Sequence, residues 1–130
     1  MTPFPRKGEA DGLPAASQRP VRTKRGDVVL CSDGRGDYTS KPRPVVIVQN
    51  SDYLDGLESV TVCPMTSVLS AASVRVRIKA NAVTGLKVPS DVEIDKITTV
   101  RVSRLSTKIG DIAEKELAKI NYALRIWLDL

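Results

Sequence analysis

The feature that most constrains the fold is a series of short apolar runs separated by Gly, Pro, Asn and Ser. Runs of this length, bounded by turn residues, are typical of β-strands. The run Pro44–Gln49 is β-branched and apolar throughout, which predicts a strand buried on both faces. In Val74–Ile78, apolar residues alternate with arginines, which predicts a strand with one solvent-exposed face. A third run is expected to stop at Pro64. The predicted strands are 27–31, 44–49, 59–63, 74–78, 92–94 and 97–102.

The apolar period changes in the C-terminal segment. Asp111 followed by Glu114 is a capping-box pattern, which predicts that a helix begins there. Apolar residues then recur at helical spacing, at positions 113, 117, 120, 124, 127 and 128. Five or six short strands followed by one helix predict a mainly β domain, a small and strongly bent antiparallel barrel with the helix packed on one end. Tyr122 and Trp127 are expected to serve core or dimer packing.

Length and charge set the organisation of the chain. The 130 residues are enough for one domain, and we expect a disordered basic leader over 1–23 and a folded domain over 24–130. The net charge is +5, and residues 1–26 account for four of these charges, so the high pI says little about the folded part. No apolar run approaches the ~18 residues of a membrane helix, so we expect no membrane partner and a cytoplasmic location.

Two residue types limit the chemistry. The chain contains no histidine, which excludes His-based acid–base catalysis, Ser-His-Asp and Cys-His nucleophiles, and the usual His-containing zinc sites. Cys31 and Cys63 are too far apart for a CxxC motif, and each lies in an apolar run. We therefore expect two buried free thiols, with a disulfide between them left open.

Three places carry polar residues that could bind or react. Arg43 lies between Pro42 and Pro44, whose fixed backbone would hold the guanidinium on a stiff mount suited to an anion; alternatively, Lys41 and Arg43 only keep an edge strand soluble. Thr66 and Ser67 follow Pro64 at a strand end, where hydroxyls donate either to a phosphate or to their own turn.

The third place is the segment PSDVEIDKITT, which contains Ser90, Asp95 and Lys96. Taken alone, Ser90 and Asp91 are explained as the cap of a turn, and Lys96 as an ion-pair partner of Asp95. No single one of the three places identifies a function by itself.

Taken together, these stretches resemble the MazF/PemK family of toxin–antitoxin ribonucleases. The resemblance covers residues 24–130 in one order, and it is carried by RGDVVL (25–30), GDYTSKPRPVVIVQN (36–50), VTVCPMTS (60–67), GLKVPSDVEIDKITTV (85–100) and the final ALRIWLDL. It implies an SH3-like barrel of five to seven antiparallel strands, of the MazF/PemK/CcdB type, that forms a homodimer. It also implies sequence-specific cleavage of single-stranded mRNA without metal or other cofactor, and neutralisation by a cognate MazE-like antitoxin.

Site residues follow from the resemblance by position. Arg43 matches the family's catalytic arginine and Thr66 its catalytic threonine, while Ser90 and Asp95 match positions that line the RNA groove. Lys96 stands where many members have Gln. The loop 32–42 matches a loop that borders the groove, and it is shorter than in many members. The remaining residues expected to bind RNA are Lys41, Ser67, Asp37 and Tyr38, the last as a stacking aromatic.

The implied chemistry needs positioning and charge stabilisation more than a protein nucleophile. RNA supplies its own 2′-hydroxyl, Arg43 can donate to two phosphate oxygens, and Thr66 can donate to a third. An arginine with a pKa above ~12 is a poor base in water. The acceptor of the 2′-proton is therefore left open between a perturbed Arg43, the carboxylates of Asp37 and Asp95, and solvent.

Two other functions fit a small β-barrel. One is a non-catalytic inhibitor of DNA gyrase that resembles CcdB and acts through protein contacts, which would not need a phosphate clamp of Arg43 and Thr66. The other is a plain single-stranded nucleic-acid binder, which the five aromatic residues of the chain disfavour because they are too few for a stacking platform.

Overall fold

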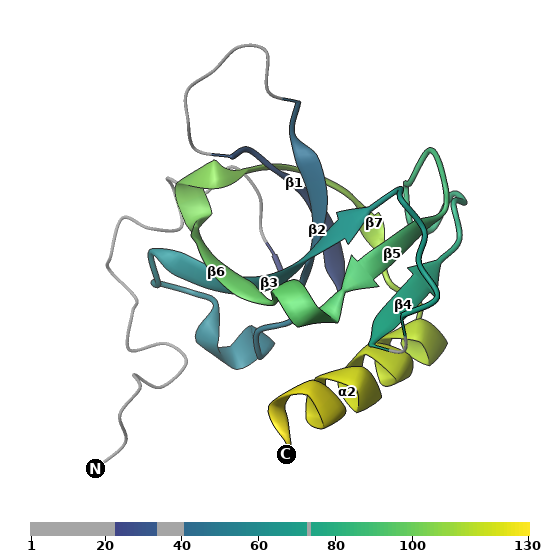
Figure 1. Cartoon of the computed structure of the whole chain (residues 1–130). Coiled ribbons are helices and arrows are strands. Elements are labelled where there is room, and N and C mark those ends of the chain that lie inside the picture. Colours follow the sequence, from purple (N-terminus) through teal and green to yellow (C-terminus); the bar gives the residue numbers. More distant parts are fainter. Residues whose placement is uncertain (1–22, 34–40, 73) are drawn as a thin grey trace.

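The structure, a computed structural model, describes residues 23–33, 41–72 and 74–130. The described part is a seven-stranded antiparallel sheet followed by one long helix (Figure 1). The elements are β1 (Asp27–Cys31), β2 (Arg43–Ile47), β3 (Ser59–Thr66), β4 (Arg75–Ile78), β5 (Ser90–Glu93), β6 (Thr98–Arg101), β7 (Leu105–Asp111) and α2 (Glu114–Leu128), with 3-10 turns at Ser51–Tyr53, Ile94–Lys96 and Val102–Arg104. Residues 1–22 of the expected leader lie outside the described residues.

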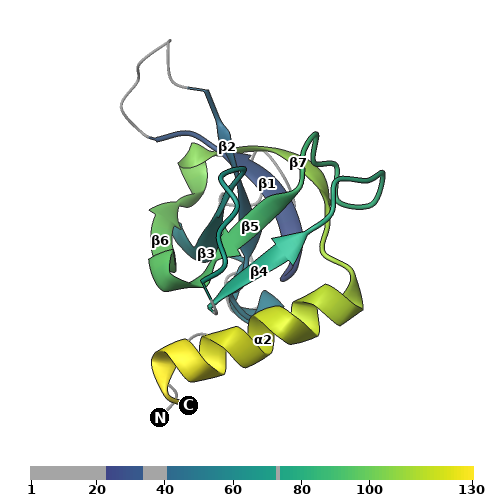
Figure 2. The same ribbon diagram turned by 45° about the vertical axis from the view of Figure 1, so that its right-hand side comes forward.

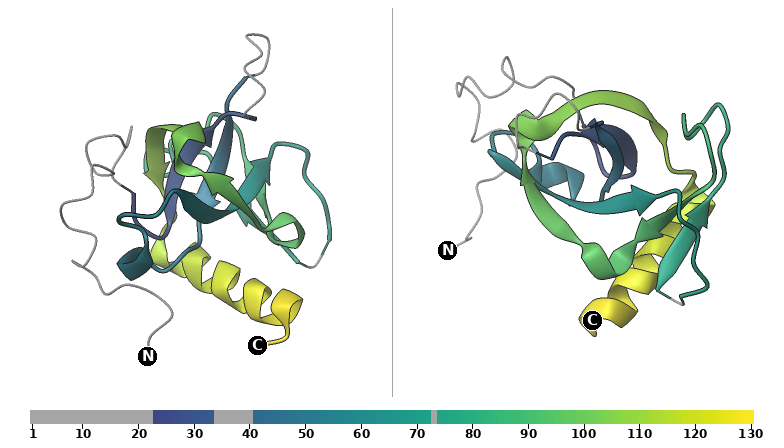
Figure 3. Two further views of the ribbon diagram at one scale, coloured as in Figure 1. Left: turned by 90° about the vertical axis from the view of Figure 1, so that its left-hand side faces the viewer. Right: turned by 45° about the horizontal axis from the view of Figure 1, so that its top comes forward.

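The sheet is strongly bent (Figure 3). The strand order is β4-β5-β3-β2-β1-β7, and β6 pairs with β3 off this path. The first half of β3 pairs with β6 on one side, and its last residues pair with β5. Among the described residues β4 and β7 are not paired with each other, so the sheet is not closed. The mainly β fold with a C-terminal helix is confirmed.

The central strands are buried on both faces, as their composition predicts. Val45, Val46, Ile47 and Val48 are all buried, and alternate residues enter two different apolar clusters. One cluster lies between the sheet and α2, and it includes Val46, Ile78, Ile94, Ile120 and Leu124. The other lies on the opposite side, and it includes Val45, Ile47, Val60, Val62 and Val100.

The expected end of the third strand at Pro64 is wrong. β3 continues to Thr66, with Pro64 paired to Val45 of β2. Pro64 lies where β3 changes partner on its other side, after Val62 has paired with β6 and before Met65 pairs with β5. A missing backbone donor is tolerated at such a break in the ladder. The strand therefore carries Thr66 as its last residue.

β7 was not predicted from the sequence. Its ladder with β1 shifts register twice, between Val28 and Val29 and again before Cys31, which destroys the alternation that marks a strand. Gly110 also has a packing role, because a Cβ at this position would collide with the carbonyl group of Thr84 in the neighbouring turn.

The helix is where the period predicts it, but its start differs. Ala113 is the N-cap residue of α2, and no side chain caps it. Ile120, Ala123 and Leu124 are buried against the sheet, whereas Trp127 keeps 48 % of its surface exposed. The helix runs beneath β4 (Figure 2). In the described part of the chain, no helix is long and apolar enough to cross a membrane.

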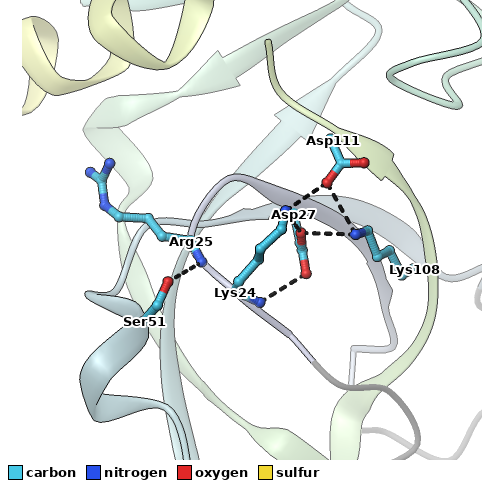
Figure 4. Close-up of polar contacts among 6 residues, drawn as sticks. All are labelled: Lys24, Arg25, Asp27, Ser51, Lys108 and Asp111. Carbon is cyan, nitrogen blue, oxygen red and sulfur yellow. Dashed lines mark hydrogen bonds and ion pairs between the residues drawn. The ribbon is translucent and has the colours of Figure 1, made fainter. Parts of the chain in front are cut away.

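Asp111 does not cap the helix because it belongs to an ion cluster at the beginning of β1 (Figure 4). Asp27 is fully buried, and its carboxylate accepts hydrogen bonds from the Lys24 backbone N–H at 2.8 Å and from Lys24 Nζ at 2.9 Å. Lys108 Nζ lies 3.2 Å from Asp27 Oδ1 and 3.0 Å from Asp111 Oδ1. Two lysines thus bridge a buried and a half-exposed carboxylate, and join β1 to β7.

Candidate active site

A hollow of about 540 Å³ opens where β1, β2, β3 and β6 meet. Val45, Val62 and Val100 form its apolar floor, and all three belong to the second apolar cluster. Lys41, Arg43 and Arg104 stand on its rim, together with Asp33, Ser32 and two threonines of β6. An apolar floor with a cationic rim suits a ligand that combines flat apolar groups with negative charge.

Arg43 is the first residue of β2, where its Cα partner is Cys31. The residue is exposed, and its side chain makes no hydrogen bond or ion pair with any described residue. Pro42 and Pro44 restrict the backbone on both sides. The guanidinium is therefore available to an anion that enters the hollow, and Lys41 lies on the same rim.

Arg104 is a third cation on the rim, and no local sequence pattern pointed to it. Its Nε donates to the Ser32 carbonyl at 2.7 Å, and the Ser32 N–H donates to the Arg104 carbonyl at 2.9 Å. This double link fixes the arginine beside the end of β1. Arg104 reaches the hollow only because β7 pairs with β1 far along the chain, so no local pattern could have revealed it.

Thr66 is the last residue of β3, which pairs with β2, the strand that begins at Arg43. The last pair of the β2–β3 ladder is Val45 with Pro64, and Arg43 and Thr66 each lie two residues beyond it. Because side chains alternate along a strand, both leave the same face of this strand pair. Thr66 is half-buried and does not line the hollow, and Ser67 beside it is exposed.

The hydroxyl of Thr66 is already used as an acceptor. Its Oγ1 accepts the Val68 backbone N–H at 3.1 Å. A hydroxyl has one proton to donate besides its lone pairs, and Thr66 makes no second side-chain hydrogen bond with the described residues. The O–H is thus free to donate to a ligand.

Three other residues expected at the site lie on the β5 side of the sheet. Ser90 is only 3 % exposed, and its hydroxyl donates to the Val88 carbonyl at 3.1 Å. Asp95 accepts hydrogen bonds from Arg75 at 3.3 and 3.4 Å. Lys96 pairs with Glu93 at 3.3 Å, so the alternative in which Lys96 pairs with Asp95 is wrong. None of the three lines the hollow.

Asp37 and Tyr38 lie outside the described residues. The sequence predictions of RNA contacts at Lys41, Ser67, Ser90, Asp95 and Lys96 remain predictions. Of these, the structure brings only Lys41 onto the rim with Arg43.

Both cysteines are buried and free, as their apolar surroundings predict. Burial raises the pKa of the Cys63 thiol to about 12, and it raises the pKa of Cys31 as well although Arg104 opposes it. A thiol needs a lowered pKa to act as a nucleophile near neutral pH. Cys31, which lines the hollow, therefore contributes apolar surface and no nucleophile.

The fold and the cation-rimmed hollow define a small β-sheet domain built to receive an anionic ligand. The profile of the family described as "PemK-like, MazF-like toxin of type II toxin-antitoxin system" matches residues 24–128, so this chain belongs to that family.

Known relatives agree with this assignment. The chain is 42 % identical over 108 residues to a probable endoribonuclease MazF of Mycolicibacterium smegmatis, a match that covers 82 % of this chain and 97 % of the relative. The structure of Mycobacterium tuberculosis toxin MazF-mt6 superposes with a TM-score of 0.69 at 27 % identity, covering 80 % of this chain and 97 % of that one.

A second structural neighbour is described as an endoribonuclease in complex with its cognate antitoxin from mycobacterial species. It superposes with a TM-score of 0.71 at 25 % identity, and the match covers 84 % of this chain and 97 % of that one. The alternative of a CcdB-like gyrase inhibitor finds no support in these comparisons.

Proposed function

We propose that the chain is a toxin endoribonuclease that cuts single-stranded RNA at the face shared by Arg43 and Thr66, and that a cognate antitoxin restrains it. Endoribonuclease activity is supported by the family and by the names of the relatives. The observation that carries the site is Arg43, which lies between two prolines at the rim of the hollow, is exposed, and has no side-chain partner among the described residues.

The residues suit internal transfer at an RNA phosphate. The 2′-oxygen attacks the adjacent phosphorus as its proton passes to solvent. The bond to the 5′-oxygen breaks as that oxygen takes up a proton from solvent, which leaves a 2′,3′-cyclic phosphate and a 5′-hydroxyl. Arg43 donates to two phosphate oxygens, and Thr66 donates to a third, so the added negative charge of the transition state is neutralised. Thr66 can do this because its lone pair, and not its proton, holds the Val68 N–H.

The hollow beside Arg43 gives the RNA a place for an unstacked base. Single-stranded RNA is read by bases that are splayed out and packed against side chains. Val45, Val62 and Val100 offer such an apolar surface, and Lys41 and Arg104 offer charge to the backbone. The same cationic rim suits the acidic tail of an antitoxin, which would block the RNA by occupying its place.

Cleavage is tested with purified protein, a long single-stranded RNA and a chelator. We expect discrete fragments whose 3′ ends carry a 2′,3′-cyclic phosphate, as the attack by the 2′-oxygen requires, and mass spectrometry of the fragments identifies these ends. The same preparation is assayed for inhibition of gyrase supercoiling. If the RNA stays intact and supercoiling is blocked, the proposal of a nuclease is rejected and the hypothesis of a gyrase inhibitor replaces it.

We also propose that the protein works as a homodimer that uses the exposed apolar residues near the C-terminal end of α2. Tyr122, Ile126, Trp127 and Leu128 are each at least 46 % exposed and lie on one helix. An apolar surface of this kind is typical of an interface. Apolar burial there would stabilise a dimer without changing the fold of each protomer.

Two aspartate substitutions in α2 should separate folding from dimerisation. Leu124 is buried, so Leu124→Asp places an unpaired charge in the core and should unfold the protein, at a cost of about 3 kcal/mol or more. Trp127→Asp should instead leave a folded monomer, since Trp127 is half-exposed. Circular dichroism and light scattering report the two properties. A Trp127→Asp variant that remains a dimer would refute this interface.

A further inference from the structure

The loop that follows Thr66 is held at one residue, Ser70. Residues 67–72 are all exposed, and they lead from β3 towards β4. The Ser70 N–H donates to Asp91 Oδ2 at 2.8 Å, the Ser70 carbonyl accepts from Arg77 Nη2 at 3.2 Å, and the Ser70 hydroxyl accepts the Ala72 N–H at 3.1 Å. Every polar group of Ser70 is engaged, so the loop has a fixed point four residues after Thr66.

The partner of Ser70 is a buried charge. Asp91 is 1 % exposed, and its Oδ1 accepts a hydrogen bond from Arg77 Nε at 3.0 Å. Burial by itself would raise the pKa of Asp91, but the hydrogen bonds from Arg77 and from the Ser70 N–H outweigh burial and bring the pKa below its usual range. The carboxylate is therefore ionised, and charge-assisted hydrogen bonds to it are strong.

Strand register connects this pair directly to Thr66. Asp91 of β5 is the Cα partner of Thr66 on one side and of Arg77 on the other. Residues paired in this way project from the same face of an antiparallel sheet. Thr66, Asp91 and Arg77 thus form one row across β3, β5 and β4, about 10 Å from end to end at the usual strand spacing.

We propose that Asp91 and Arg77 are positioning residues for RNA cleavage, which fix the 67–72 loop at Ser70 so that Thr66 presents its hydroxyl proton outward to the phosphate. This inference rests on the proposed function. The loop determines where the Val68 N–H lies, and this N–H in turn sets the rotation of the Thr66 hydroxyl. Arg77 and Asp91 do not themselves touch the RNA.

The test replaces Arg77, whose side chain is 52 % exposed and can be changed without opening the core. In Arg77→Gln the Ser70 anchor loosens, and kcat should fall about 10- to 100-fold, while KM changes less than about twofold. Arg77→Lys keeps a donor for Asp91 and should recover part of the loss. Asp91→Asn keeps one acceptor oxygen, which can serve Ser70 or Arg77 but not both as the two carboxylate oxygens do, and it should show a loss between those of the two Arg77 variants.

The matched control is Lys79→Gln, because Lys79 directly follows β4, is exposed, and makes no side-chain hydrogen bond or ion pair with the described residues. It removes the same charge as Arg77→Gln, and it should cut RNA like the unmodified protein. Thermal melting of each variant shows that the fold is retained.

A second measurement separates positioning from direct contact. With enzyme in excess, Arg77→Gln should cause no further loss of rate when it is added to Thr66→Ala, since the only role of Arg77 is to orient Thr66. A loss that persists in the Thr66→Ala background, or a rise in KM with kcat unchanged, would overturn the inference. If the unmodified protein cuts RNA and Arg77→Gln cuts equally fast, this inference fails alone, whereas no cutting by the unmodified protein rejects the proposed function.

Discussion

Arg43→Ala should lower the rate of RNA cleavage by about 10³-fold and leave the melting temperature unchanged. The loss is large because the guanidinium is the group that meets the charge developing on the phosphate, and removing one such donor typically costs about 10²–10³ in rate. Stability is retained because Arg43 is exposed and bonds no described side chain. Single-turnover cleavage and thermal melting give the two values.

Variants at neighbouring positions make the test specific. Arg43→Lys keeps the charge and loses the fork that reaches two oxygens, so its rate should lie between those of the unmodified and alanine proteins. Thr66→Ala should lower the rate by about 10²-fold because it removes a single donor. Arg101→Ala removes an exposed arginine of β6 and should cut RNA normally. If Arg43→Ala melts early, or cuts as fast as Arg101→Ala, then Arg43 is not the phosphate donor.

The fold was predictable where a local pattern decides the structure. The β-branched run of β2 predicted a strand buried on both faces, and the alternation of β4 predicted a strand with one exposed face. The structure confirms both burial patterns. β7 was missed because its two register shifts remove any alternation. The expected helix cap at Asp111 was wrong because that carboxylate pairs with Lys108 and with Lys24, which is distant in the sequence, instead of with the helix N-terminus.

The site shows the same division between local and distant information. The two prolines that flank Arg43 are a local signal, so the sequence alone marked this residue as a candidate, and its catalytic role stays a prediction. Thr66 was placed at a strand end for the wrong reason, since β3 runs through Pro64 and ends at Thr66 itself. Strand pairing brings Arg104 to the hollow, and it also aligns the row of Thr66, Asp91 and Arg77. Neither composition nor spacing reveals these pairings.

The ion cluster at the start of β1 carries the largest stability effect that we expect. In the double variant Lys24→Met, Lys108→Met, the carboxylate of the fully buried Asp27 keeps the backbone N–H of Lys24 as its only donor among the described residues. A buried charge without its partner costs about 3–5 kcal/mol of folding free energy. Urea unfolding near pH 7 should show this loss. The exposed pair Lys79→Met, Lys87→Met is the control, and it should unfold close to the unmodified protein.

Adding Asp27→Asn to the double variant should restore part of the lost stability, because the uncompensated charge is then gone. If the triple variant is no more stable than the double one, the loss comes from lysine packing and not from the charge of Asp27.

The cluster also sets the pH range of stability. Hydrogen bonds from Lys24 and Lys108 hold the pKa of Asp111 at about 2, below the ordinary value of about 3.9. A lowered carboxyl pKa stabilises the fold above its unfolded value, so this contribution should be lost as the pH falls from about 5 towards 2. Hydrogen bonds from Lys24 to Asp111 and Asp27 raise the pKa of Lys24 to about 12, so its contribution should be lost as the pH rises from about 10 towards 12. Melting temperatures measured across pH should form a plateau between these limits. Asp111→Asn should make the acid side less steep, since it removes one of the two carboxylates with a lowered pKa among the described residues, and Asp91 should account for part of what is left.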